Sequence, residues 1–269
     1  MPRLAIFWVL IVAATAAFVA GCALNASIWL QGSVGGRAAP GLRAALAAGW
    51  RGLRRVGPGR LLRALLRDGL WHRRLRATDR GRWLAHALLL GGFLAMFALS
   101  TLTGLCQEVL ILLFKVRHPL VEAIVNKDTP VMALANEALG VAMLAGLALM
   151  IVRRYVRRPA QLRTAAPDTA LIVLLAVTLL SGYPTEVLRI LAERVPASLA
   201  WYSFVAYPLS LPAQGLDWPW PALHDWAFLF HSSFAAAFLA YAPFSKFFHV
   251  LVSPIVAAAN SAAREVELA

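Results

Sequence analysis

The sequence contains few charged residues and very few cysteines. Asp, Glu, Lys and Arg make up 14% of the 269 residues, against 60% hydrophobic residues, which argues against a disordered chain and against an ordinary soluble domain. Cys22 and Cys106 lie in apolar stretches and belong to no C-x-x-C pair. A cysteine-bound metal or iron–sulfur cluster within this chain is therefore unsupported. The sequence also lacks a nucleophile constellation and a phosphate-binding loop, the usual motifs of a self-contained enzyme.

The sequence is instead rich in long apolar runs. Mean hydropathy is +0.68, and several runs exceed the roughly 18 residues that cross a hydrocarbon layer as a helix. We therefore predict an all-α integral membrane bundle of five transmembrane helices. The predicted helices cover residues 5–29, 83–114, 132–152, 169–192 and 222–252.

Basic residues concentrate in two of the connecting loops. Residues 31–82 hold thirteen arginines and two acidic residues, and residues 153–163 hold five arginines, whereas residues 115–131 hold three basic residues and residues 196–221 hold none. Because basic loops stay in the cytoplasm, we predict the N-terminus outside and the C-terminus inside. The net charge of +13 then reflects membrane topology, and we expect no nucleic-acid partner.

The segment Val19-Ala20-Gly21-Cys22 resembles a lipoprotein cleavage site. Cleavage there would export the arginine-rich loop, against the positive-inside bias. We therefore expect these residues to remain in a first transmembrane helix.

The arginine-rich loop contains two short amphipathic patterns, at residues 42–56 and 61–75, separated by Gly57-Pro58-Gly59. Trp50 and Trp71 lie among the arginines. The two patterns fit helices lying on anionic lipid head groups. They equally fit a docking platform for a cytoplasmic partner, and the two interpretations are compatible.

Histidines at membrane depth are functional candidates, because ionisable groups are costly there. His231 and His249 are eighteen residues apart, which on one helix predicts imidazoles on the same face, about 27 Å apart. His86 is predicted to lie at the depth of His249, near the cytoplasm. Two imidazoles from neighbouring helices can hold a six-coordinate b-type haem. The alternative is a histidine that bonds a helix carbonyl or lies at the interface.

The ligand opposite His231 is less well defined. Met96 lies ten residues after His86, and a thioether can ligate haem iron, although methionine in an apolar helix more often fills a core. His224 is the alternative, with an interfacial place beside Asp225 as its simpler interpretation. The small residues that would leave room for the macrocycle are Gly91, Gly92, Ala95, Ala235, Ala236, Ala237 and Ala240.

The last apolar segment and three earlier ones contain recognisable motifs. The motifs are His231-x17-His249, Tyr241-Ala242-Pro243-Phe244-Ser245-Lys246-Phe247-Phe248-His249, Val252-Ser253-Pro254, Trp83-x2-His86, Gly92-Phe93, Asp168 and Gly182-x3-Glu186-x2-Arg189. With them the last segment resembles the final span of the respiratory nitrate reductase gamma subunit superfamily. Within it, the nearest resemblance is to the heterodisulfide-reductase-like and dissimilatory sulfite-reductase-associated membrane cytochrome b subunits.

The resemblance implies an electron-transfer subunit with two b haems in the bacterial inner (cytoplasmic) membrane, acting in dissimilatory sulfur metabolism. It implies His86 and His249 as ligands of the inner haem and His231 as one ligand of the outer haem. A nitrate reductase gamma subunit has a second histidine where Met96 stands, which favours the heterodisulfide-reductase-like branch and leaves the sixth outer ligand open. A gamma subunit of a respiratory nitrate reductase remains an alternative.

The partners that the resemblance implies are a quinone, menaquinone or ubiquinone, and a cytoplasmic iron–sulfur heterodisulfide-reductase-like subunit. Other membrane and periplasmic redox subunits are also expected. Because the sequence ends at Ala269 without cluster-binding cysteines, we expect the iron–sulfur partner to be a separate polypeptide. A non-redox anchor or transporter is the rival class, although the sequence has no internal repeat of the kind common in transporters.

Quinone chemistry moves protons as well as electrons, so its site needs ionisable or hydrogen-bonding groups near the outer haem. Gln107 with Glu108, and Glu186 with Arg189, are the predicted quinone-site residues. Glu186 and Arg189 are three apart and can also form a purely structural ion pair. Lys246 is predicted to contact a haem propionate, although a lysine reaching for the interface would look the same.

These predictions divide the chain into four parts. The parts are a first transmembrane helix (1–30), a basic cytoplasmic loop with amphipathic helices (31–82), a four-helix haem-binding membrane core (83–255) and a cytoplasmic tail (256–269).

Overall fold

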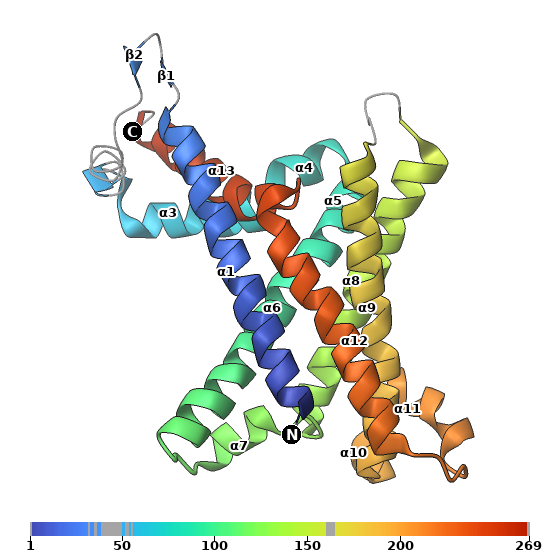
Figure 1. Cartoon of the computed structure of the whole chain (residues 1–269). Helices are drawn as coiled ribbons and strands as arrows, with labels where there is room; N and C mark the ends of the chain where they lie inside the picture. The colour runs from blue at the N-terminus through green and yellow to red at the C-terminus, as the bar shows by residue number, and fades with distance from the viewer. Residues whose placement is uncertain are drawn as a thin grey trace. The chain divides into compact units, whose positions relative to one another are not determined.

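The computed structural model describes residues 2–31, 33–34, 37–38, 50–51, 54, 56–159 and 165–267. Nearly all of them are helical (Figure 1), as predicted. The strands within these ranges are a two-residue antiparallel pair, β1 (Ser33–Val34) and β2 (Arg37–Ala38). Five helical stretches are long and apolar enough to cross a membrane, namely Arg3–Ile28, Arg80–Leu113, Pro119–Arg157, Ala166–Glu193 and Trp220–Phe244.

Several of these stretches combine α-helical and π-helical turns. A π-helical turn inserts one residue into the helix and shifts the side chains that follow it. The helices are α1 (Pro2–Gln31), α3 (Pro58–Ala64), η1 (Leu65–Leu70), α4 (Arg73–Thr78), α5 (Arg80–His86), η2 (Ala87–Gly91), α6 (Gly92–Gly104), η3 (Leu105–Leu113), α7 (Pro119–Val125), α8 (Pro130–Ile151), η4 (Val152–Arg157), α9 (Ala166–Glu193), α10 (Ala197–Ala200), α11 (Ala206–Ser210), η5 (Leu211–Ala213), α12 (Trp220–Tyr241), η6 (Ala242–Phe244) and α13 (Phe248–Glu267).

Large apolar side chains point outward from these helices. Val9 of α1, Val131 of α8 and Trp226 of α12 are 69%, 76% and 74% exposed. Exposed apolar area on this scale would be unfavourable in water and favourable against lipid tails. The surface is therefore that of a multi-pass membrane protein, in agreement with the sequence prediction.

The chain forms two compact units. Unit 1 comprises Met1–Phe7, Leu84–Thr164 and Ile172–Ala235, and unit 2 comprises Trp8–Trp83, Ala165–Leu171 and Ala236–Ala269. The boundaries of these units are set by contacts between helices and differ from the four parts predicted from the sequence. Those four parts remain predictions.

In unit 1, α8 packs closely against η2 and α6 because glycines stand at both contacts. A Cβ added to Gly146 would lie 2.6 Å from the backbone nitrogen of Leu89, and one added to Gly92 would lie 2.6 Å from Cγ of Met143. Small residues of this kind let helix backbones approach in a membrane. Gly92 is therefore used in helix packing, whereas a Cβ on Gly91 would meet nothing within 4 Å.

The N-terminal end of α1 lies beside the start of α12, also within unit 1. Arg3 forms an ion pair with Asp225, and the rings of Phe7 and Phe228 are 5.4 Å apart. The N-terminus therefore lies at the same end of unit 1 as the start of α12, as the predicted topology requires.

In unit 2, the C-terminal helix α13 packs on α3 and η1 of the arginine-rich loop. Ala64 and Ala258 are 2% and 1% exposed in this contact, and a Cβ on Gly69 would lie 2.7 Å from the carbonyl oxygen of Pro254. The second predicted amphipathic helix thus exists, although it runs from Pro58 to Leu70. The first, predicted at residues 42–56, lies mostly outside the described residues.

The fifth predicted segment is not one continuous helix. Helix α12 ends at Tyr241, a short 3₁₀ turn follows, Ser245 is extended, and α13 begins at Phe248. Pro243 in the turn lacks a backbone N–H donor, and the hydroxyl oxygen of Ser245 accepts the N–H of Phe247 at 3.1 Å, which starts the new helix. The prediction that His231 and His249 lie on one helix and share one face is therefore wrong.

Candidate electron-transfer site

His231 on α12 faces α9 in unit 1 and is half-buried. Its Nδ1 lies 3.0 Å from the hydroxyl oxygen of Ser181, which can donate its one proton to the carbonyl of Thr178 at 3.1 Å. When Ser181 donates to Thr178, its oxygen accepts from Nδ1–H; the same 3.0 Å contact also fits the other tautomer, in which Ser181 donates to Nδ1. A neutral imidazole protonated at Nδ1 has its lone pair on Nε2.

This tautomer fits an axial ligand of haem iron. Metal-binding histidines usually donate their other ring N–H to an acceptor that fixes the orientation of the ring, and Ser181 supplies that acceptor. Gly182 lies along the ring edge, where an added Cβ would be 3.5 Å from Cε1 of His231. The hydroxyl of Thr185 donates to the carbonyl of Ala227 at 3.2 Å, which ties α9 to α12 beside the histidine.

His249 is exposed near the start of α13 in unit 2. Its Nδ1 contacts the carbonyl oxygen of Lys246, and because a carbonyl only accepts, Nδ1 carries the proton in the neutral ring. The side chain of Lys246 pairs with Asp168 at 2.8 Å, and Asp168 also accepts the backbone N–H of Ala165 at 3.1 Å. Lys246 thus has a protein partner that the sequence did not predict, and its contact with a haem propionate remains a prediction.

The other predicted ligands lie in unit 1. His86 closes α5 and Met96 lies in α6, and both are half-buried. His224 is half-buried in α12, with its ring 6.4 Å from that of Phe228. His86 and His249 belong to different units, so their pairing around one iron remains a prediction.

Glu186 and Arg189 form the predicted ion pair and belong to a larger network. Arg189 is 5% exposed and donates to both carboxylate oxygens of Glu186, at 3.0 and 2.8 Å. It also donates to Asp128 and to Glu193, at 2.7 Å each. Ser203 donates to Glu186 at 3.5 Å. Three carboxylates thus surround one guanidinium, which is consistent with a structural role.

Gln107 and Glu108 lie in the π-helical segment η3 and are half-buried. Among the described residues, neither one joins the Arg189 network by a hydrogen bond or an ion pair. The structure therefore does not unite the two predicted quinone clusters through direct contacts.

Glu137 on α8 and Tyr183 on α9 were not predicted from the sequence as site residues. Glu137 is 5% exposed, and within the described ranges its Oε2 and the hydroxyl of Tyr183 are buried without a hydrogen-bond partner. A signal for Glu137 was available, because it is the one charged residue between Pro130 and Ile151. Nothing in the sequence singled out Tyr183.

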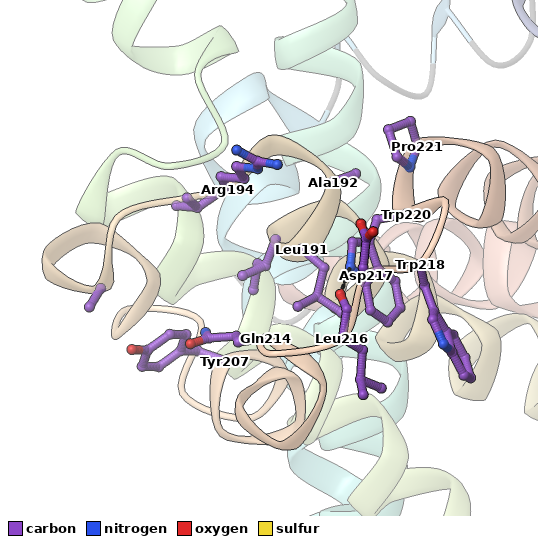
Figure 2. A pocket seen from close by; sticks show the side chains of 13 residues that line it. Leu191, Ala192, Arg194, Tyr207, Gln214, Leu216, Asp217, Trp218, Trp220 and Pro221 are labelled. Atoms are coloured by element: carbon purple, nitrogen blue, oxygen red, sulfur yellow. Dashed lines mark hydrogen bonds between the residues drawn. The ribbon is translucent and has the colours of Figure 1, made fainter.

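A pocket of about 430 Å³ lies between the C-terminal end of α9 and the start of α12 (Figure 2). Its wall includes Tyr207, Gln214 and Asp217. The rings of Trp218 and Trp220 are stacked 5.5 Å apart, and the indole N–H of Trp220 donates to the carbonyl of Leu216 at 3.2 Å.

No group of three or more His, Cys, Asp or Glu side chains among the described residues is arranged to hold a metal ion. A haem iron needs two axial ligands from the protein, so this finding does not bear on the predicted haems.

Residues 116–261 match the family model described as nitrate reductase gamma subunit. The chain is also similar to the E subunit of dihydromethanophenazine:CoB–CoM heterodisulfide reductase from two organisms. It is 28% identical to that of Methanosarcina thermophila and 27% identical to that of Methanosarcina barkeri, over 206 residues in each case. Each match covers 74% of this chain and 66% of the relative. No solved structure gives a significant match.

Proposed function

The chain belongs to the nitrate reductase gamma subunit family, and from this we propose that it is a membrane cytochrome b subunit of a redox complex. It passes electrons between a lipid-soluble carrier of the quinone class and a cytoplasmic iron–sulfur subunit of the heterodisulfide-reductase-like kind. The similarity to the heterodisulfide reductase E subunits supports this assignment. The relatives' name includes dihydromethanophenazine, a reduced electron carrier, which supports a small redox-active molecule as the electron donor.

The arrangement of His231 and Ser181 is the observation that carries the proposal. A histidine at membrane depth has a cost, and here its ring lies against a hydroxyl that can accept from Nδ1–H, which leaves the lone pair of Nε2 for a metal. His231 therefore serves best as an axial ligand.

The remaining roles follow the sequence predictions. His86 and His249 would hold an inner haem, His231 would hold an outer one, and Met96 or His224 would supply the second ligand of the outer haem. Bound haem supplies one-electron chemistry through ferric and ferrous iron. Lys246 would contact a haem propionate, and the basic loop at residues 31–82 would bind anionic lipid head groups or the cytoplasmic partner.

The quinone-class carrier is oxidised near the end of the bundle predicted to face outward. Glu186, Arg189, Gln107 and Glu108 remain the proposed residues around it. The complex lies in the bacterial inner membrane and acts in dissimilatory sulfur metabolism.

Reduction of the purified chain by a short-chain naphthohydroquinone, followed by visible absorbance, tests this proposal. We expect a b-type haem spectrum to develop in the wild type and to be strongly diminished in His231→Ala. His118→Ala is the matched control, because His118 is exposed and only accepts the N–H of Leu120 at 3.2 Å. A haem-loaded chain that the hydroquinone does not reduce would contradict the proposal and favour a non-redox anchor.

A further inference from the structure

The Glu137 carboxyl group lies inside unit 1, within a helix that is long and apolar enough to span the membrane. Its Oε1 accepts the backbone N–H of Ala206 at 3.3 Å, while its Oε2 has no partner among the described residues. The backbone at Val205 also bonds to this carboxyl group. An unpaired carboxyl oxygen is unusual at 5% exposure, because buried polar atoms are nearly always paired.

The Tyr183 hydroxyl approaches the same face of α8. It lies so close to Gly140 that an added Cβ there would be 2.8 Å from the hydroxyl oxygen. Gly140 is three residues after Glu137, and residues three apart are neighbours on a helix surface. The Glu137 Oε2 and the Tyr183 hydroxyl, each without a hydrogen-bond partner among the described residues, therefore lie at neighbouring turns of α8.

Nearby cations do not neutralise Glu137. The guanidinium of Arg189 is engaged by Glu186, Asp128 and Glu193. An ionised carboxylate without a cation is costly at membrane depth, so the resting side chain is expected to carry a proton. A protonated carboxyl can donate a proton in one direction and take one up from another.

Glu137 and Tyr183 lie between two features of unit 1, namely His231 and the pocket in Figure 2. Tyr183 is two residues from Ser181, about 3 Å along the axis of α9, so it lies near the depth of His231. On its other side Glu137 bonds to Ala206, and the next residue, Tyr207, lines the pocket in Figure 2. Glu137 thus lies between the level of the proposed haem ligand and the wall of that pocket.

We propose that Glu137, assisted by Tyr183, carries the protons released when a hydroquinone is oxidised and passes them toward the pocket. Glu137 first gives its proton to water. Tyr183 then takes a proton from the hydroquinone hydroxyl as it gives its own, through a bridging water, to the Glu137 carboxylate, so one hydroquinone O–H bond breaks for each Glu137 O–H bond that forms. Two such cycles remove two protons from the hydroquinone, and bound haem would be the acceptor of its two electrons.

This inference rests on the proposed function, and the experiment separates the two. Wild type, Glu137→Gln, Glu137→Asp and Tyr183→Phe are purified with haem, and the haem spectrum after dithionite reduction is recorded for each. The rate of haem reduction by a short-chain naphthohydroquinone is then measured. Glu122→Gln is the matched control, because its side chain is 54% exposed and forms only a 3.8 Å pair with Arg117.

We expect Glu137→Gln to keep the dithionite spectrum, since its amide oxygen still accepts from Ala206, while hydroquinone-driven reduction slows by about 100-fold, the low end of the range for general acid–base catalysis. Glu137→Asp should restore part of the rate, Tyr183→Phe should slow it less than Glu137→Gln, and Glu122→Gln should match the wild type. In infrared redox difference spectra, the band of a protonated carboxyl group should be absent from Glu137→Gln.

A wild-type rate in Glu137→Gln would overturn the inference while leaving the proposed function intact. Equal slowing in Glu137→Gln and Glu137→Asp, with normal haem content, would show a packing role and would also overturn it. A wild-type chain that binds no haem would overturn the proposed function itself.

Discussion

At the residue scale, one hydroxyl group contacts the ring nitrogen of His231 that points away from the proposed metal. Ser181 lies within hydrogen-bond distance of the carbonyl of Thr178 and of Nδ1 of His231, and when it donates to Thr178 its oxygen accepts from Nδ1–H. The nitrogen left with a lone pair is the one a haem iron would use. This relation joins residues fifty positions apart, which the histidine spacing alone did not indicate.

We predict that Ser181→Ala weakens haem binding. Removing the acceptor frees the ring to rotate and makes it a weaker donor, and loss of such a supporting bond typically costs 10- to 100-fold in metal affinity or activity. Haem titration of the apoprotein measures the effect, and the midpoint potential should rise at the same time. Ser233→Ala is the control, since Ser233 bonds only to the carbonyl of Leu229 at 2.7 Å. Equal affinities in the two variants would contradict the assignment.

Arg189 provides a second residue-scale prediction. Arg189→Met leaves three carboxylates near one another without their cation, so the free energy of unfolding should fall by about 3–5 kcal/mol. Chemical denaturation in detergent measures it. Glu193→Gln should cost less than about 1 kcal/mol, because the side chain of Glu193 is 52% exposed. If Arg189→Met kept its stability and lost only hydroquinone oxidation, the structural role of Arg189 would be refuted and its proposed quinone role would remain.

At the scale of elements, glycine contacts set how closely the helices of unit 1 pack. Gly146 brings α8 against the backbone of α5 and η2. A Cβ added to Gly146 would meet backbone atoms of Ala85 and Leu89, which cannot move aside as a flexible side chain can. The π-helical turns of η2 lie at this contact, directly after His86. The position of His86 therefore depends on the approach of α8.

We expect Gly146→Ala to destabilise unit 1 by about 1–3 kcal/mol, the usual cost of overpacking. Thermal unfolding in detergent is the measurement. Gly91→Ala is the matched control, because a Cβ there meets nothing within 4 Å. If both variants unfolded at the same temperature, the close α8–η2 contact would be refuted.

The sequence predicted where the helices lie better than where a helix is interrupted. Hydropathy located all five apolar helices because burial in lipid requires long uninterrupted apolar runs. It did not reveal the end of α12, since proline is tolerated in many membrane helices and only the extended Ser245 shows that the helix stops. The Lys246–Asp168 pair and the approach of Tyr183 to Gly140 depend on which helices are neighbours, and periodicity along one chain carries no such information.

At the scale of the whole molecule, the distribution of arginine is the feature that orients the chain. The loop at residues 31–82 holds thirteen arginines, and residues 196–221 hold no basic residue. Unit 1 places Arg3 beside Asp225, so the N-terminus shares an end with the start of α12. The charge asymmetry then predicts that this end faces the outside.

We predict opposite labelling of two single-cysteine variants made in a Cys22→Ala, Cys106→Ala background. A membrane-impermeant maleimide added to intact cells should label Lys127→Cys and spare Thr78→Cys, because both positions are exposed but lie on opposite predicted sides. Permeabilised cells should label both, which serves as the control. Labelling of Thr78→Cys alone in intact cells would show that the topology is opposite to the predicted one.

The central claim is that histidines of this chain hold haem within the membrane. The reduced-minus-oxidised visible spectrum of the purified full chain, produced with haem supplied, tests it most directly. We predict a b-type α band that is diminished in His231→Ala and unchanged in His118→Ala. A colourless wild-type preparation would contradict the claim.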